Sequence, residues 1–174
     1  MKKYYEAYDD RYRIIHEKGL QWSADAATPS VLETIVKYGI GKDSPILEIG
    51  CGEGRDAKPL MDLGYDLYAS DVSEEAVRYC RMKYPEHTGR FFILDCLNGI
   101  LSKEYRFIYA VAVLHMLTED DDRKAFYGFI KDHLVSGGIA LICSMGDGEA
   151  EFSTDSREAF DLKERDHFSG RVTV

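Results

Sequence analysis

Cysteine is scarce in this sequence, and it never occurs in the close pairs that bind zinc or form redox motifs. The four cysteines, Cys51, Cys80, Cys96 and Cys143, are widely separated. A chain of 174 residues can bury a sizeable core without disulfide bonds. The pattern therefore predicts reduced thiols and a cytoplasmic protein, rather than a disulfide-rich domain or a zinc site.

Long apolar runs are also missing. The longest is residues 107–114, whereas a helix that spans a membrane needs roughly twenty apolar residues. The lysines near the N-terminus are not followed by an apolar segment, so the start of the chain does not have the pattern of a signal peptide. We therefore expect no membrane partner.

Basic residues are outnumbered by acidic ones, 22 against 31, which gives a net charge of −9. Nucleic-acid surfaces take much of their affinity from clustered lysine and arginine, so we expect no nucleic-acid partner. The 45% hydrophobic and 30% charged residues are typical of a globular protein. Oligomeric state is not readable from these numbers.

Short hydrophobic segments alternate with helical patterns along most of the chain. Strands are predicted at residues 46–49, 66–72, 91–94, 106–114 and 139–143. Helices are predicted at residues 2–18, from Thr28 to Gly39, from about Arg55 to Leu63, from Ser73 to Pro85, and from a capping box at Thr118 to Ser136. Such alternation predicts an α/β three-layer sandwich, a Rossmann-like and mostly parallel sheet with helices on both faces. A helix at 158–164 and a strand at 170–174 are further expectations for the tail.

Polar features follow three of the predicted strands. A loop with glycine at alternate positions, Gly50, Gly52 and Gly54, comes directly after the first strand. Asp71 ends the second strand, where a carboxylate can accept two hydrogen bonds from a ribose diol, and Asp95 ends the third, where it can accept from an adenine amine. Because ligands bind beyond the carboxyl ends of such strands, these features predict a site for a nucleoside compound.

The residues around the loop favour a cofactor that carries positive charge and no phosphate. A turn that binds pyrophosphate requires a glycine where this chain has Arg55. Glu48 and Glu53 add negative charge where a diphosphate would lie. S-Adenosylmethionine has an ammonium and a sulfonium group, so the electrostatics favour it over NAD.

Five motifs in this order resemble the class I S-adenosylmethionine-dependent methyltransferases. They are the loop of residues 48–54, Asp71, the pair Asp95-Cys96, residues 112–117 after the fourth strand, and residues 137–141 at the fifth. The resemblance covers about residues 12–144, and residues 55–57 are similar to the loop in tellurite- and thiopurine-methylating relatives. The Asn/Asp-Pro-Pro-Tyr motif of base-amino methyltransferases is absent. The resemblance implies methyl transfer to a small-molecule acceptor.

The resemblance also implies a set of site residues. Those expected to bind the cofactor are Glu48, Gly50, Cys51, Gly52, Gly54, Asp71, Val72, Asp95, Cys96 and Ala112, with Tyr12 and Trp22 in an aromatic lid. Residues 1–40 would form a helical cap and residues 41–174 the cofactor-binding domain, within one structural unit. Two strands that usually complete the family's sheet have only 30 residues left after Ser144, so we expect this edge of the sheet to be incomplete.

Several alternatives stay open at this point. Asp71 could instead cap the helix that follows, although Ser73 is the better cap and would leave Asp71 free. His115 could act as a base on the acceptor or serve as a wall of the site, and the lid aromatics could belong to the core. Residues 120–122 are better explained as an acidic helix start than as a metal site. A cofactor-binding module without catalysis, or a nucleotide-dependent oxidoreductase, remain the rival functions.

Overall fold

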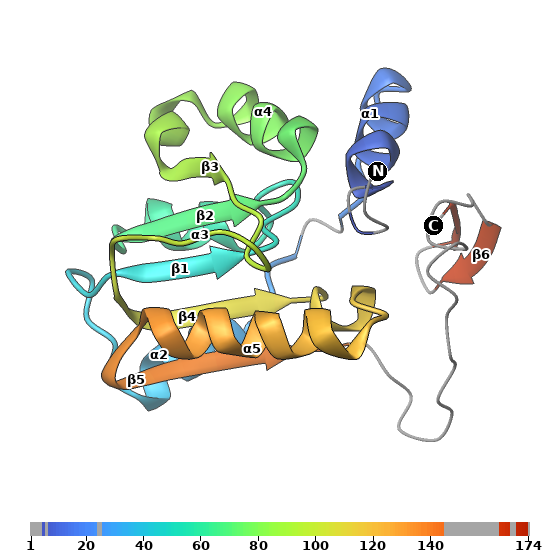
Figure 1. Ribbon diagram of the computed structural model, residues 1–174. Coiled ribbons are helices and arrows are strands. Elements are labelled where there is room, and N and C mark those ends of the chain that lie inside the picture. The colour runs from blue at the N-terminus through green and yellow to red at the C-terminus, as the bar shows by residue number, and fades with distance from the viewer. Residues whose placement is uncertain (1–4, 6, 24–25, 145–163, 168–169, 174) are drawn as a thin grey trace.

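The computed structural model describes residues 5, 7–23, 26–144, 164–167 and 170–173 (Figure 1). Its centre is a five-stranded sheet in the order β3-β2-β1-β4-β5, in which every neighbouring pair is parallel. The strands are β1 (Ile46–Ile49), β2 (Leu67–Asp71), β3 (Phe91–Ile93), β4 (Tyr105–Val111) and β5 (Leu134–Cys143). The carboxyl ends of all five therefore meet at one edge of the sheet.

Helices cover both faces of this sheet, which confirms the predicted three-layer fold. One core cluster joins the sheet to α2 (Pro29–Lys37), α3 (Ala57–Asp62) and α4 (Glu74–Lys83). A second cluster joins the opposite face to α5 (Asp120–His133). Both clusters use the apolar stripe of each helix, and burying these stripes against the sheet is the main favourable contribution to folding.

The central strands explain why the sequence folds in this way. Ile46, Leu47, Phe107 and Ile108 are fully buried, and successive side chains along a strand point to opposite faces. A run that is apolar at every position, not at alternate ones, therefore suits a strand with helices on both sides. This is why β1 and β4 were recognisable in the sequence.

The helix starts agree with the sequence in two cases and disagree in one. Pro29 begins α2, and the Ser73 hydroxyl accepts a hydrogen bond from the Ala76 amide at 3.0 Å as the N-cap of α4. The capping box predicted at Thr118 is wrong, because Glu119 is the N-cap residue of α5 and its side chain makes no capping hydrogen bond. Three aspartates in the first turn of α5 lie at the positive end of its dipole instead.

Strand β5 is longer than predicted. The sequence suggested that residues 136–138 end the preceding helix, but these residues lie inside the strand. Leu134 pairs with Tyr105 and Ile139 with Phe107, so the register shifts between the two pairs, and Gly137 takes a φ of +71° there. The glycine accommodates an irregularity in the ladder instead of ending a helix.

A separate antiparallel pair of strands, β6 (Glu164–His167) and β7 (Gly170–Thr173), lies in the C-terminal part of the chain. The strand predicted at 170–174 corresponds to β7. The helix predicted at 158–164 lies outside the described residues except for Glu164, which belongs to β6. Among the described helices, none has the length and apolar character that crossing a membrane requires.

Candidate functional site

The loop that joins β1 to α3 has the backbone that its glycines predict. Gly50, Gly52 and Gly54 have φ values of +75°, +52° and +78°, a region that side chains with a Cβ rarely adopt. The amides of Gly50 and Cys51 both donate to the Ser70 carbonyl, at 2.7 and 2.8 Å, which fixes the loop against the end of β2. The loop is therefore a rigid turn at the carboxyl edge of the sheet.

Asp71 lies at the end of β2, but its carboxylate is not free, contrary to the expectation from the sequence. One oxygen accepts from the Gly52 amide at 2.8 Å and the other from the Ser73 amide at 2.9 Å. Burial raises the pKa of Asp71 despite these bonds, and the side chain is 7% exposed. Each oxygen keeps a second lone pair, so the carboxylate ties the glycine loop to α4 and can still accept from a ligand.

Asp95 follows β3 and contacts Tyr5, in the N-terminal part of the chain. Its Oδ2 accepts from the Tyr5 hydroxyl at 3.1 Å and from the Asn98 amide group at 2.8 Å, while Oδ1 accepts from the Leu97 amide at 2.9 Å. Burial raises the pKa of the neighbouring Cys96 to about 12, so that thiol stays protonated near neutral pH. Asp95, the predicted adenine acceptor, thus lies beyond the carboxyl end of β3.

Glu48 lies in β1 beneath the glycine loop and is 2% exposed. Its Oε2 and the Tyr109 hydroxyl are both buried, and neither has a hydrogen-bond partner among the described residues. Burial, together with the nearby charge of Asp56, raises the pKa of Glu48 well above its ordinary value. The Tyr109 side chain interacts with the Glu48 carboxyl and partly offsets this rise. A buried carboxyl with one oxygen left unpartnered is costly for the fold, so Glu48 is a candidate for a ligand-binding role.

Arg55 does not make the loop a phosphate site. Its guanidinium donates to Asp56 at 2.8 Å and to the Thr28 hydroxyl at 3.0 Å, while Asp56 also accepts from the Thr28 amide. The positive charge is therefore used to join the loop to the start of α2. The preference for a cofactor without phosphate agrees with this geometry.

The segment after β4 forms the other wall beside the loop. Ala112 has a φ of +60°, an uncommon conformation for a residue other than glycine, and its amide donates to the Cys143 carbonyl at 2.8 Å. A Cβ added to Gly50 would lie 2.3 Å from the Val113 side chain, so the two segments touch. Such backbone strain tends to occur at functional sites. His115 follows in a short 3-10 helix, and burial lowers its pKa.

The small residues beneath the loop act as packing. Cys51 and Cys80 are both buried, and their sulfur atoms lie 3.8 and 3.2 Å from the Gly52 carbonyl oxygen. Contact with Cys80 and burial raise the pKa of Cys51 well above its ordinary value, so its thiol is a filler and a poor nucleophile. Val72 is half-buried directly after Asp71.

Helix α1 (Ala7–Glu17) lies beside α4 at the carboxyl edge of the sheet (Figure 1). A Cβ added to Gly52 would lie 2.6 Å from the Tyr12 hydroxyl, so Tyr12 covers the loop, and Trp22 packs against Tyr12 with ring centroids 5.9 Å apart. The two predicted lid residues are thus brought together. The structure also places Tyr8 there, whose hydroxyl contacts Met116 at 2.6 Å.

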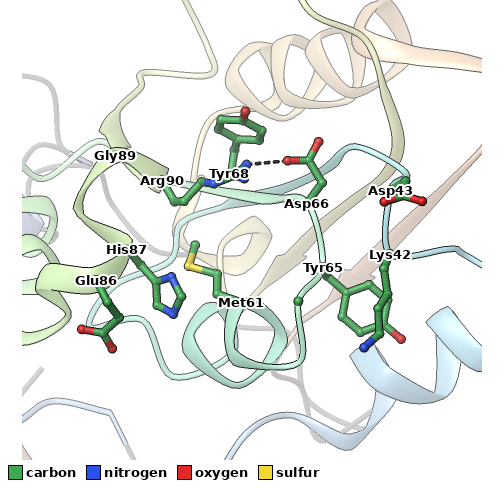
Figure 2. A pocket seen from close by; sticks show the side chains of 11 residues that line it. Lys42, Asp43, Met61, Tyr65, Asp66, Tyr68, Glu86, His87, Gly89 and Arg90 are labelled. Carbon is green, nitrogen blue, oxygen red and sulfur yellow. Dashed lines mark hydrogen bonds and ion pairs between the residues drawn. The ribbon is translucent and has the colours of Figure 1, made fainter.

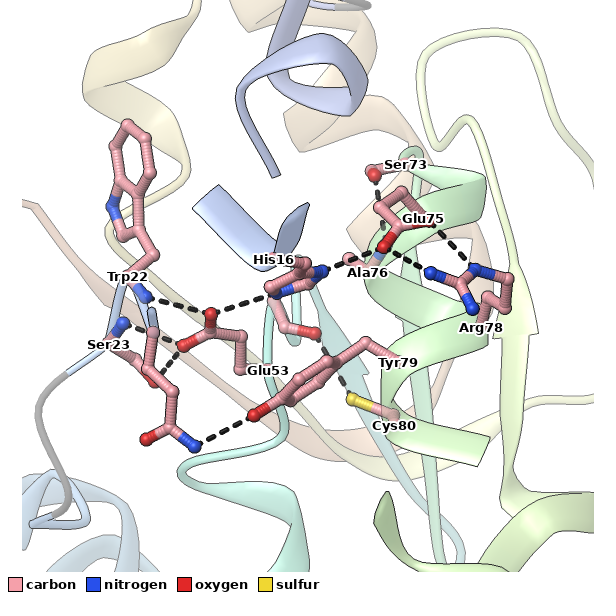
Figure 3. A network of polar contacts seen from close by, with 12 residues as sticks. His16, Trp22, Ser23, Glu53, Ser73, Glu75, Ala76, Arg78, Tyr79 and Cys80 are labelled. Carbon is pink, nitrogen blue, oxygen red and sulfur yellow. Dashed lines mark hydrogen bonds and ion pairs between the residues drawn. The ribbon is translucent and has the colours of Figure 1, made fainter. Parts of the chain in front are cut away.

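Glu53 is the polar centre of this region, a role that was not predicted from the sequence (Figure 3). Its carboxylate accepts from the amides of Trp22 and Ser23 at 2.8 and 2.7 Å, from the Ser23 hydroxyl at 2.7 Å, and lies 3.0 Å from His16 Nε2. Burial alone would raise the pKa of Glu53, but the hydrogen bonds from Ser23 and Trp22 outweigh it and lower the pKa.

A large cavity lies elsewhere, at the amino ends of the strands (Figure 2). It measures about 730 Å³, and Asp66, Tyr68 and Arg90 form part of its wall, with Arg90 paired to Asp66. Ligands of such sheets bind at the opposite, carboxyl edge. A smaller cavity, of about 110 Å³, lies beside Glu53 and Arg55. The carboxyl edge is instead occupied by α1.

Comparison with known proteins agrees with the family that the sequence motifs resemble. Residues 46–138, more than half of the chain, match the family model of the methyltransferase domain. A structure of an S-adenosylmethionine-dependent methyltransferase from Clostridium acetobutylicum is 22% identical, with a TM-score of 0.58 over 64% of this chain and 46% of that one. A structure of the glycopeptide N-methyltransferase MtfA complexed with S-adenosyl-L-methionine is 21% identical, with a TM-score of 0.62 over 89% of this chain and 68% of that one.

One curated relative is more similar over a short stretch. The ribosomal RNA small subunit methyltransferase A of Parabacteroides distasonis is 37% identical over 62 residues, which are 36% of this chain and 23% of that protein. The chain thus spans about half to two thirds of the solved structures above and a quarter of this relative.

The sheet order, the glycine loop and the acidic residues at the strand ends define the fold of a class I methyltransferase. The chain belongs to the methyltransferase domain family, that of the S-adenosylmethionine-dependent class I enzymes. The resemblance inferred from the sequence motifs is thereby confirmed.

Proposed function

We propose that this chain binds S-adenosylmethionine across the carboxyl ends of β1, β2 and β3 and transfers its methyl group to a small-molecule acceptor. The observation that supports this best is the rigid turn of three glycines with positive φ, which lies next to two carboxylates, Asp71 and Asp95. The chain that carries this turn belongs to a family of methyltransferases. The positive side chain of this loop, Arg55, is paired with Asp56 and is therefore not available to bind a phosphate.

The residues of the site fit the cofactor's groups. Asp71 would accept from the ribose hydroxyls and Asp95 from the adenine amine, while the backbone of the glycine loop and the buried Glu48 would hold the methionine end. The bound cofactor supplies a methyl group on a sulfonium, which is already activated for displacement. The protein therefore has to align the acceptor and exclude water, and the aromatic rings of Tyr12 and Trp22 suit both tasks.

The acceptor is proposed to be small. The net charge of −9 is unsuitable for a nucleic acid surface, and the glycopeptide N-methyltransferase shows that the same fold serves acceptors other than nucleic acids. The four free cysteines further support a cytoplasmic location.

Calorimetry and a transfer assay test this function. Purified chain is expected to bind S-adenosylmethionine and S-adenosylhomocysteine with micromolar affinity, and to transfer labelled methyl groups to a member of a metabolite panel. Ribosomal RNA is included as an acceptor. Binding of NAD without binding of S-adenosylmethionine would overturn the proposal, and labelling of RNA alone would overturn the small-molecule acceptor.

His115 is the proposed base. Because burial lowers its pKa, the imidazole is neutral near pH 7 and can accept a proton from an acceptor hydroxyl or amine. We expect His115→Gln to lower kcat about 100-fold, at the low end of the usual effect of a general base. Affinity for S-adenosylhomocysteine, measured by calorimetry, should change little. An unchanged kcat would show that His115 is only a wall of the site.

A further inference from the structure

Helix α1 contacts the same groups that the proposed cofactor needs. Tyr5, just before the helix, donates to Asp95 Oδ2, which is the proposed adenine acceptor. Tyr12 covers Gly52, which is part of the proposed cradle for the methionine end. Helix α1 in this position therefore covers the surface that the cofactor needs, so α1 has to move before the cofactor can enter.

Two side chains of α1, Asp9 and His16, fasten the helix to α4 and to the glycine loop. Asp9 Oδ1 accepts from the Ser73 hydroxyl and the Glu75 amide, both at 2.9 Å, so it binds the positive end of α4. About two helical turns further along, His16 lies between two carboxylates: Nε2 is 3.0 Å from Glu53 Oε1 and Nδ1 is 2.8 Å from Glu75 Oε1 (Figure 3). We call the triad of His16, Glu53 and Glu75 the latch.

The latch requires a protonated imidazole. A carboxylate oxygen only accepts hydrogen bonds, so each ring nitrogen of His16 has to donate, and only the imidazolium has two N–H groups. The neutral ring would donate to one carboxylate and direct a lone pair at the other. The His16 side chain is 7% exposed and those of Glu53 and Glu75 are 1% and 11% exposed. Water therefore screens the repulsion between the ring's lone pair and the carboxylate poorly.

Titratable groups on three elements face His16. On α4 these are Glu75, which also binds Arg78 at 2.6 Å, and Tyr79, whose ring stacks on the imidazole at 4.1 Å. On the glycine loop it is Glu53, and on α1 itself it is Tyr12, with ring centroids 5.8 Å apart. The two carboxylates accept the hydrogen bonds of the imidazole. Tyr79 and Tyr12 contact it through their rings.

We propose that protonated His16 latches α1 shut over the cofactor site, and that loss of its proton releases the helix and admits the cofactor. His16 is then a positioning residue, which acts on binding through α1 and does not touch the reacting atoms. The proposal rests on the proposed cofactor site. Because the closed form cannot bind, apparent affinity falls by the fraction of molecules that are open.

The association rate constant of S-adenosylhomocysteine, measured by stopped-flow fluorescence, tests the latch. For the wild-type chain it is expected to rise about tenfold as the pH is raised, because only the imidazole that has lost its proton lets α1 open. His16→Gln, whose amide donates from one atom and accepts at the other like the neutral ring, should associate at the fast rate at every pH. A matched control is His87→Gln, since His87 lies in the wall of the distant large cavity.

Two outcomes would overturn the latch. One is a wild-type rate that keeps its pH dependence in His16→Gln, because another group would then be responsible. The other is slower association or faster release in His16→Gln, which would describe a lid that retains the cofactor and does not exclude it.

Hydrogen exchange of the α1 amides tests the same idea without any ligand. Corrected for intrinsic rates, exchange is expected to be about tenfold faster in Glu75→Gln than in Glu74→Gln, an exposed neighbour in the same turn of α4. Equal exchange in the two variants would contradict the latch. Faster exchange without any cofactor binding at any pH would support the latch and contradict the proposed function, so the two failures are distinguishable.

Discussion

Replacing Asp71 with asparagine is expected to weaken binding of S-adenosylhomocysteine at least about 100-fold. A hydrogen bond to a charged group contributes about 1.5–3 kcal/mol, and a ribose diol would make two of them. Since about 1.4 kcal/mol corresponds to a factor of ten, the loss of both gives roughly 100-fold or more. Calorimetric titration of the purified variant measures it.

The structure adds a complication that the experiment has to resolve, because Asp71 also binds the amides of Gly52 and Ser73. The Asp71→Asn substitution would disturb that loop whether or not a ribose is bound. The test is therefore repeated with the 2′,3′-dideoxy analogue. If Asp71 holds the sugar, Asp71→Asn should lower the affinity for this analogue far less than the affinity for S-adenosylhomocysteine. Equal losses of affinity for both ligands would assign Asp71 to the loop alone.

A matched control is available at the opposite end of β2. Asp66 directly precedes β2 at the other edge of the sheet and pairs with Arg90 and Lys103. Asp66→Asn makes the same chemical change far from the glycine loop. It is expected to leave the affinity for S-adenosylhomocysteine unchanged, and a loss comparable to that of Asp71→Asn would point to a general effect on the fold.

The sequence predicted the parts of this protein that depend on local chemistry. The apolar runs of β1 and β4 identify buried strands, and the glycines at 50, 52 and 54 identify a turn in which each has a positive φ. Asp71 and Asp95 could be placed near that turn because parallel strands end at one edge. These inferences need only periodicity and strand direction.

What could not be predicted depends on contacts between distant residues. Nothing near Glu53 in the sequence indicates that His16, Trp22 and Ser23 converge on it, because those contacts exist only once α1 has packed on α4. Asp71 was expected to be free for the same reason: its bond to the Gly52 amide links residues 19 positions apart. The one available signal was the charge of Glu53 itself, in a loop where it has no local partner.

Replacing Glu48 with glutamine is expected to change the pH dependence of stability. Burial raises the pKa of Glu48 well above that of an exposed glutamate. At pH values between the unfolded and the folded pKa, the folded chain therefore holds a proton that the unfolded chain has released. The contribution of Glu48 to the stability of the wild type therefore falls as pH rises above about 4.5, by up to about 1.4 kcal/mol per pH unit. Glutamine cannot ionise, so the advantage of Glu48→Gln should grow with pH. Urea unfolding from about pH 5 to pH 8 measures the difference.

The same variant tests why a carboxyl with such a cost is present in β1. If Glu48 holds the cofactor's ammonium, Glu48→Gln should bind S-adenosylhomocysteine at least about tenfold more weakly, the effect of losing one hydrogen bond to a charged group. Wild-type affinity should also increase more steeply with pH than that of the variant, because ionised Glu48 becomes available only in the wild type. A control ligand without the ammonium, 5′-methylthioadenosine, should bind both chains equally. A variant that is more stable and binds equally well would mean that Glu48 serves neither the fold nor the cofactor.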